Sequence, residues 1–180
     1  MPDNSNSLAE LQKNNLILSE KLKEICVEKG LRVATAESLT GGLISAAIVA
    51  VPGSSDYFDR GFSVYNNQAK EDVLGVSVKT ISAFTEVSGQ CVQEMASGAL
   101  ARSRADLAVA VSGVAGPGPS GGNPAGTVWI GVCRRSQSAI SRRFLFEGDR
   151  TMVREYTVFQ SLSALLAMAE DLPLKNFSRL

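Results

Sequence analysis

The chain has 180 residues, of which 44% are hydrophobic and 20% are charged, and this balance is typical of one soluble globular domain with a sizeable core. Its 18 basic and 18 acidic residues cancel, which argues against a nucleic-acid partner, because such proteins normally carry a basic excess. The chain contains no histidine, so Ser-His-Asp and Cys-His catalysis and the usual zinc sites are excluded.

Helical and extended patterns alternate through the first half of the chain. They predict a helix over residues 7–29, a strand over 31–35, a helix over 43–51, a strand over 61–65 and a short helix over 68–74. Ser7 and Glu10 fit a capping box at the start of the first helix. Gly30 and Gly75 are typical residues for ending the first and the last of these helices.

The second half continues the alternation and adds a hairpin. Its patterns predict a helix over residues 88–104, a strand over 107–111, a hairpin of strands over 127–133 and 140–146, and a last helix over 151–170. Val87-Ser88 fits a hydrophobic staple and an N-cap at the start of the first of these helices. Residues 107–111 have no polar face, which predicts a central strand that is buried on both sides. We therefore expect one α/β domain over residues 1–180, with a mixed sheet covered on both faces and with residues 1–6 disordered.

A polar turn joins the first strand to the second helix. Ser38 and Thr40 place hydroxyl groups there, and Gly41 and Gly42 allow a ligand to approach the backbone closely. The free N–H groups at the start of the following helix favour an anion or a developing oxyanion. The alternative is that Ser38 or Thr40 is only the N-cap of that helix.

The loop over residues 113–126 is the second candidate for a binding segment. It holds six of the 16 glycines and three of the six prolines. Backbone N–H groups near Ser112, Gly113 and Gly116 could hold a phosphate or a carboxamide oxygen, although a long surface loop is the alternative. If its strand is a parallel neighbour of the first strand, this loop and the turn at Ser38 form one cleft.

Arg150 could bind a phosphate with its two-pronged guanidinium group. The alternative is that Asp149-Arg150 is simply a helix start, where an aspartate is stabilised by the helix dipole. The pattern does not decide between these two interpretations.

Ser38 needs a base, and Lys70 is the best candidate because it follows a strand end by a short helical segment. A free lysine has a pKa of ~10.4, so a neutral lysine near pH 7 costs roughly 4 kcal/mol unless burial lowers the pKa. Tyr65 could relay the proton or share the role. The alternatives are a solvated Lys70 and a Tyr65 that is only a core aromatic. Glu37 should point away from Ser38, because neighbours on a strand face opposite ways.

The N-terminus is polar and no apolar run reaches membrane length, so we expect a cytoplasmic protein. Cys26, Cys91 and Cys133 are widely spaced and odd in number, which predicts buried free thiols in a reducing compartment. The pattern indicates neither a metal site nor a cofactor.

Seven short motifs occur in a fixed order along the chain. They are Thr35-Ala36-Glu37-Ser38-x-Thr40-Gly41-Gly42, Pro52-Gly53-Ser54-Ser55, Arg60-Gly61-Phe62 with Tyr65, Asn67-x-Ala69-Lys70, Ser112-Gly113-x-Ala115-Gly116-Pro117, Gly126-Thr127-Val128-Trp129 and Gly148-Asp149-Arg150. In this combination the chain resembles the competence/damage-inducible CinA C-terminal domain family from about residue 31 to residue 170. The resemblance implies a three-layer α/β/α domain and a nicotinamide-nucleotide amidase, which converts nicotinamide mononucleotide into nicotinate mononucleotide and ammonia.

The resemblance also implies roles for individual residues. Ser38 would be the nucleophile with Lys70 and Tyr65 as its activators, while Thr40, Ser112 and Gly113 would line the pocket. Some positions depart from the family pattern. Leu39 stands where Cys is common, Gln68 where Glu is usual, Phe84-Thr85-Glu86 in place of His-Gly-Ala, and Gly89 in place of Glu. Departures beside the motifs could weaken the activity or change the substrate.

Two other functions remain open. The chain could be an inactive relative that binds a nucleotide and regulates a partner, or a scaffold that acts through protein contacts. The expected partner is a small-molecule nucleotide, with no nucleic acid and no membrane, and the chain could form a homo-oligomer.

Overall fold

Five strands form one mixed sheet at the centre of the computed structural model, which describes residues 8–174. The strands are β1 (Val33–Glu37), β2 (Phe58–Ser63), β3 (Leu107–Gly113), β4 (Thr127–Arg134) and β5 (Ile140–Leu145). Their order is β2-β1-β3-β4-β5, with β1 parallel to both β2 and β3, and with β4 antiparallel to both β3 and β5. The mixed sheet and its terminal hairpin are therefore confirmed.

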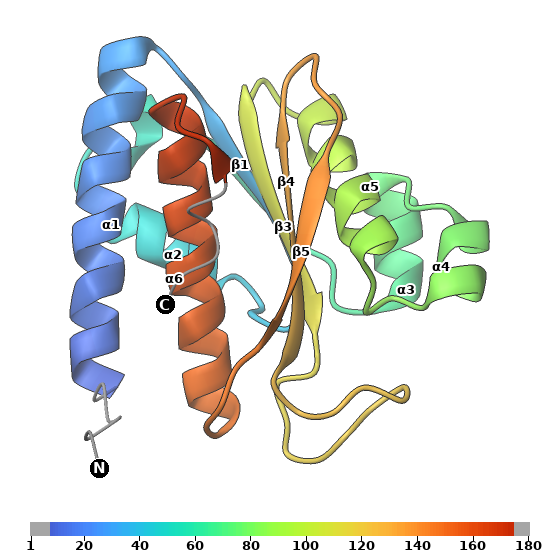
Figure 1. The fold of residues 1–180 in the computed structure, drawn as a ribbon. Coiled ribbons are helices and arrows are strands. Elements are labelled where there is room, and N and C mark those ends of the chain that lie inside the picture. The colour runs from blue at the N-terminus through green and yellow to red at the C-terminus, as the bar shows by residue number, and fades with distance from the viewer. Residues whose placement is uncertain (1–7, 175–180) are drawn as a thin grey trace.

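Helices cover both faces of this sheet and make three layers (Figure 1). One face carries α1 (Leu8–Lys29), α2 (Leu43–Val49) and α6 (Arg150–Ala169). The other face carries α3 (Asn67–Ala69), the π-helix η2 (Lys70–Leu74), α4 (Val78–Phe84) and α5 (Gly89–Ala101). A single 3-10 turn, η1 (Ser54–Asp56), lies between α2 and β2. The α/β/α architecture that the resemblance implied is confirmed.

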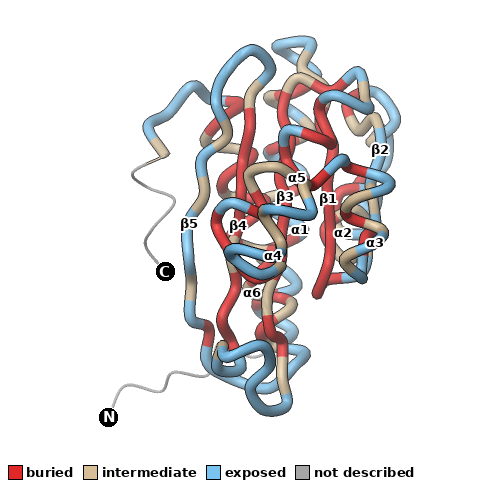
Figure 2. The backbone as a smooth tube through the Cα atoms, turned by 90° about the vertical axis from the view of Figure 1, so that its right-hand side faces the viewer, coloured by how far each residue is buried: buried red, intermediate tan, exposed pale blue. Residues whose placement is uncertain are grey.

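The burial pattern follows the position of each strand in the sheet (Figure 2). All five residues of β1 and the first six residues of β3 are buried, whereas β2 and β5 are edge strands with mostly intermediate or exposed side chains. Alternate residues of β1 join two separate cores. Val33 packs on the side of α1 and α6, and Ala34 and Ala36 pack on the side of α5.

Strand β2 lies earlier in the chain than the predicted strand over residues 61–65. Gly61 does not begin this strand but lies within it, where β2 pairs with Thr35 and passes under α2. A Cβ atom at position 61 would come within 2.9 Å of Thr35 Oγ1 and closer still to Ser45 Oγ. Glycine is thus required by close packing rather than by a turn.

Helix α4 was not predicted, whereas the N-cap of α5 was. The apolar residues Val78 and Phe84 of α4 are exposed, so that the helix has no clear buried face. Ser88 is the N-cap of α5, as predicted, and its hydroxyl accepts a hydrogen bond from Cys91 N at 3.2 Å. Ser7 and residues 1–6 lie outside the described residues.

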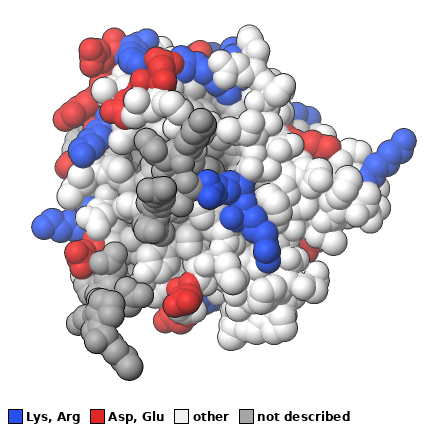
Figure 3. Space-filling view, in the orientation of Figure 1, with Lys and Arg blue, Asp and Glu red and all other residues white. Residues whose placement is uncertain are grey.

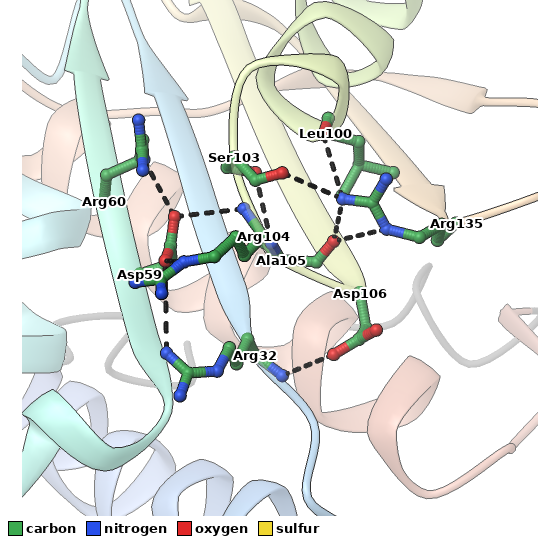
Figure 4. Close-up of polar contacts among 9 residues, drawn as sticks. All are labelled: Arg32, Asp59, Arg60, Leu100, Ser103, Arg104, Ala105, Asp106 and Arg135. Carbon is green, nitrogen blue, oxygen red and sulfur yellow. Dashed lines mark hydrogen bonds and ion pairs between the residues drawn. The ribbon is translucent and has the colours of Figure 1, made fainter.

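Asp59 forms an ion-pair cluster at the end of the sheet where β1 and β3 begin (Figure 4). Its side chain is 1% exposed and lies 2.8 Å from Arg60 Nε, 3.3 Å from Arg104 Nε and 4.0 Å from Arg32 Nη1. Burial alone would raise the pKa of Asp59, but the hydrogen bonds and charges of Arg60 and Arg104 outweigh it, so that the pKa is lowered. Asp59 thereby links β2 to the segments that precede β1 and β3.

Candidate active site

The alternation of β1 sends Glu37 and Ser38 to opposite faces of the sheet. Glu37 is fully buried, and its carboxylate accepts hydrogen bonds from the backbone N–H groups of Gly42 and Ile44, at 3.0 Å each, and of Ser45 at 2.8 Å. The anion at the start of α2 is therefore a side chain of the protein itself. The prediction of a ligand anion at this helix start is wrong, because its donors are already used.

Neither Ser38 nor Thr40 caps α2. The N-cap residue is Gly42, which has no side chain to offer, and Glu37 takes over the capping role from the preceding strand. The Thr40 side chain is fully buried, and its carbonyl oxygen accepts a hydrogen bond from Arg154 Nη2 at 2.8 Å. The turn therefore leaves the Ser38 hydroxyl free for another role.

Ser38 faces the side of the sheet on which Lys70 lies. Its backbone N–H continues the pairing of β1 with β3 by donating to Val111 O at 3.1 Å. Lys70 Nζ lies 3.2 Å from Ser38 Oγ, and Ser38 Oγ lies 3.4 Å from the carbonyl oxygen of Tyr65. The predicted contact between Lys70 and Ser38 is thus present.

Lys70 is completely buried, so the alternative of a solvated helix residue is wrong. It opens η2, a π-helical segment of the kind often found at functional sites. The side chain folds back onto the segment after β2, where Nζ donates to the carbonyl oxygens of Val64, Tyr65 and Asn66 at 3.1, 3.2 and 3.5 Å. Burial lowers the pKa of Lys70, and the negative charge of Glu86 offsets only part of this effect.

Tyr65 contributes to this cluster through its backbone rather than its phenol ring. Its carbonyl oxygen contacts both Ser38 and Lys70, whereas its side chain is 63% exposed. The phenol hydroxyl accepts a hydrogen bond from Arg150 Nη2 at 3.3 Å. Among the described residues, no hydrogen bond joins the phenol hydroxyl to Ser38 or Lys70, and its one such contact is with Arg150 at the rim of the site.

The turn at Ser38 and the loop after β3 line one pocket of about 240 Å³, as predicted from their positions at the carboxyl ends of parallel strands. Its lining residues are Ser38, Leu39, Tyr65, Glu86, Val87, residues 112–120 and Arg150. Of the predicted binding residues, Ser112, Gly113, Gly116 and Arg150 line this pocket. Thr40, Gly41 and Gly42 do not, because the chain turns from Ser38 toward α2 on the other face of the sheet.

Arg150 is exposed at the rim of the pocket. Its Nη1 donates to Gly116 O at 2.9 Å, while Nη2 reaches the Tyr65 hydroxyl. Asp149 is the N-cap of α6 and accepts a hydrogen bond from Met152 N at 2.9 Å, so it faces its own helix. Arg150 alone of this pair remains a candidate for binding an anion.

The segment between α4 and α5 also contributes to the pocket, which was not predicted. Glu86 and Val87 from this segment line the pocket beside Ser38 and Leu39. The only local signal was the pair Val87-Ser88, which fits a hydrophobic staple and an N-cap for the next helix. Nothing in the pattern indicated that this turn meets the ends of β1 and β3.

Other features of the described residues bear on the earlier expectations. Cys26, Cys91 and Cys133 are buried and free, as predicted. Within residues 8–174 no group of Cys, Asp and Glu side chains could hold a metal ion. No helix in this part of the chain is long and apolar enough to cross a bilayer.

Comparisons with known proteins agree on one family. The CinA C-terminal domain matches residues 15–169. The chain is 46% identical over 158 residues to the nicotinamide-nucleotide amidohydrolase PncC of Enterobacter agglomerans, which covers 83% of this chain and 96% of that protein. It is 43% identical over 149 residues to the protein of the same name from Escherichia coli strain K12. This match covers 82% of this chain and 90% of that protein. The crystal structure of the competence/damage inducible protein CihA from Agrobacterium tumefaciens has a TM-score of 0.83 at 41% identity, covering 86% of this chain and 95% of that one.

Proposed function

The chain belongs to the CinA C-terminal domain family, and we propose that it is a nicotinamide-nucleotide amidase that converts nicotinamide mononucleotide into nicotinate mononucleotide and ammonia. The names of two relatives with more than 40% identity support this substrate. The observation that carries the proposal is the contact of 3.2 Å between a buried Lys70 Nζ and Ser38 Oγ beside the pocket. A serine activated by a lysine is a known arrangement for acyl transfer without histidine.

In the proposed reaction, neutral Lys70 takes the proton of Ser38 while Ser38 Oγ attacks the carboxamide carbon. The resulting ammonium group of Lys70 then gives this proton to the departing nitrogen, which leaves as ammonia. Water hydrolyses the acyl-serine ester in the second half of the reaction, again with Lys70 as the base. In each half of the reaction Lys70 takes up one proton and gives it up again, so that it ends in its neutral form.

The rest of the pocket supplies binding. Ser112 lies on the same face of the sheet as Ser38. Each serine comes two residues after an alanine that packs against α5, and residues two apart on a strand share a face. Arg150 at the rim is the candidate ligand for the phosphate of the nucleotide, because guanidinium groups bind phosphate with two parallel hydrogen bonds. We retain the cytoplasm as the proposed compartment, in keeping with three free thiols.

Ammonia release from nicotinamide mononucleotide tests the function, and the variant Ser38→Ala tests the nucleophile. We expect the intact chain to release ammonia and Ser38→Ala to lose roughly 10³-fold or more in kcat. Loss of the contact with Lys70 should cost only about 1 kcal/mol of folding free energy, so the variant stays folded. Ser55→Ala, an exposed serine in η1, is the control and should keep its turnover. Failure of the intact chain to release ammonia would contradict the activity, and near-normal turnover by Ser38→Ala would contradict the nucleophile.

A further inference from the structure

The pocket carries one negative and one positive side chain. Among the described residues that line it, only Glu86 and Arg150 are charged. The loop over residues 113–126 contains no charged residue, and the surface at the lower end of the molecule, where this loop lies, is largely uncharged (Figure 3). Such a pocket is complementary to a ligand with an anionic group at one point and a cationic group at another.

Glu86 is held at the pocket by a strained turn. Thr85, the residue before it, has φ 68° and ψ 169°, a region that is almost exclusive to glycine. Ser88 Oγ donates to Thr85 O at 2.8 Å and accepts from Cys91 N, so that α5 fixes the turn from its other end. Strain of this kind persists where the surroundings impose it, and it is concentrated at ligand sites.

The Glu86 carboxylate has no hydrogen-bonded donor in the part of the chain that the structure describes, although it is half-buried. Glu86 lines the pocket together with Ser38 and Leu39, whereas Arg150 lies at the rim next to Tyr65 and Gly116. The charge of Glu86 also acts on Lys70, since it raises the pKa of that residue against the effect of burial. A charge without a partner in such a position is available to a ligand.

We propose that Glu86 is a specificity residue that pairs with the positively charged pyridinium ring of the substrate while Arg150 binds the phosphate. This inference rests on the proposed amidase function. The ring that bears the carboxamide exists in two forms, an oxidised form with a cationic ring and a dihydro form with a neutral ring. Both forms carry the same amide and the same phosphate, so Glu86 selects the oxidised nucleotide over the dihydro nucleotide.

Calorimetric binding of the two forms of nicotinamide mononucleotide tests this selection. Ser38→Ala serves as the background because it prevents turnover during the measurement. Adding Glu86→Gln should weaken binding of the oxidised form by about 10-fold or more, as expected for the loss of a close charge pair, and should change binding of the dihydro form by less than about twofold. The matched control is Glu20→Gln, an exposed residue of α1 on the opposite face of the sheet, and it should change neither.

Charge reversal gives a second readout. Glu86→Lys should invert the preference, so that the dihydro form binds more tightly than the oxidised form. The proposal is overturned if Glu86→Gln weakens both forms equally, if it weakens neither, or if Glu86→Lys keeps the preference for the oxidised form. Equal weakening would indicate that Glu86 only supports the turn.

Ammonia release by the intact chain, measured in parallel, separates this inference from the proposed function. Selective loss of oxidised nucleotide binding in Glu86→Gln, with no ammonia release by the intact chain, would support the specificity and reject the amidase. Ammonia release together with an equal loss for both forms would keep the amidase and reject the role of Glu86. Absence of binding of either form to the chain would reject both.

Discussion

Lys70 Nζ meets four oxygen atoms in its buried position, and only one of them carries a proton. Three are the carbonyl oxygens of consecutive residues, which can accept hydrogen bonds but cannot donate them. The fourth is Ser38 Oγ. When Lys70 is neutral, its lone pair can therefore receive a hydrogen bond only from Ser38 among these four groups. The three carbonyl oxygens thus orient Lys70 Nζ to accept the proton of Ser38.

Substitution of Lys70 tests whether it acts as a base or only as a positive charge. Lys70→Met should reduce kcat by roughly 10²-fold or more, and so should Lys70→Arg, which keeps the charge but cannot lose its proton. Thermal unfolding of both variants provides the control, because position 70 is fully buried and arginine is larger. A folded Lys70→Arg that turns over at nearly the normal rate would contradict the role as a base.

The pH profile of the reaction gives a second test of the base. Because burial lowers the pKa of Lys70, the neutral and active form should predominate above a pH that lies below the usual range for lysine. We expect kcat/KM to rise with pH through this pKa and then to reach a plateau. Lys70→Met should lose the rising limb, whereas a limb that persists in this variant would belong to another group.

The sequence could identify Ser38 and Lys70 but not the way in which they meet. The polar turn that carries Ser38 and the short helical segment that carries Lys70 are local patterns, and both are present. The contacts of Lys70 Nζ with three carbonyl oxygens depend on η2 folding back on the end of β2, which no local pattern encodes. For Tyr65, the sequence identified the residue but not the group that enters the site. Since β2 ends at Ser63, the chain has left the strand at Tyr65, and its carbonyl rather than its hydroxyl enters the site.

At the scale of the elements, the turn from β1 to α2 depends on a buried anion. Glu37 also accepts hydrogen bonds from Ser45 Oγ at 2.7 Å and Thr35 Oγ1 at 3.3 Å, so that strand and helix are joined through one carboxylate. The interaction with the free N–H groups of α2 satisfies donors that would otherwise be buried without partners. Ser38 directly follows Glu37, and its position is thereby coupled to the start of α2.

Glu37→Gln should disturb this turn. The amide nitrogen would face N–H donors in place of an accepting oxygen, which should cost about 2–3 kcal/mol of unfolding free energy in urea titrations. We also expect kcat to fall while the pKa seen in the rate profile stays near its original value, because Lys70 lies on the other face. Glu24→Gln, an exposed substitution on α1, is the control. Equal midpoints for the two variants would show that the carboxylate is not needed at the turn.

The sequence could not reveal this role for Glu37. Helix starts are normally recognised from the residue just before the helix, and here the capping group lies on the preceding strand. Ser38 and Thr40 matched the local rule for an N-cap and were therefore the alternative expected at this turn. Ser88, by contrast, follows the local rule and was recognised as the N-cap of α5.

Over the whole molecule, the sheet separates two kinds of polar cluster. The pocket lies where β1 and β3 end. The Asp59 cluster lies where these strands begin (Figure 4). The alternation of strands and helices was sufficient to predict the mixed sheet with helices on both faces. The sequence predicted the start of β2 three residues too late, because the charged residues at the start of this edge strand and its internal glycine resemble a loop.

The separation predicts that the Asp59 cluster stabilises the fold without acting on the reaction. Asp59→Asn removes the carboxylate shared by Arg32, Arg60 and Arg104, and should cost about 1.5–3 kcal/mol, or a decrease of roughly 4–10 °C in Tm. Asp56→Asn, an exposed neighbour in η1, should change the stability by less than about 0.5 kcal/mol. Ammonia release by folded Asp59→Asn should match that of the parent.

The pH dependence of this stability has a definite sign. The pKa of Asp59 is lower in the folded chain than in the unfolded chain, so the unfolded chain binds the proton first as the pH falls. The contribution is complete above the unfolded pKa of about 3.9 and is lost as the pH falls through the folded pKa. The difference in unfolding free energy between parent and Asp59→Asn should therefore be constant near neutral pH and shrink in acid. A difference that stays constant down to the lowest pH at which both remain folded would show that packing, rather than the ionised carboxylate, accounts for the effect.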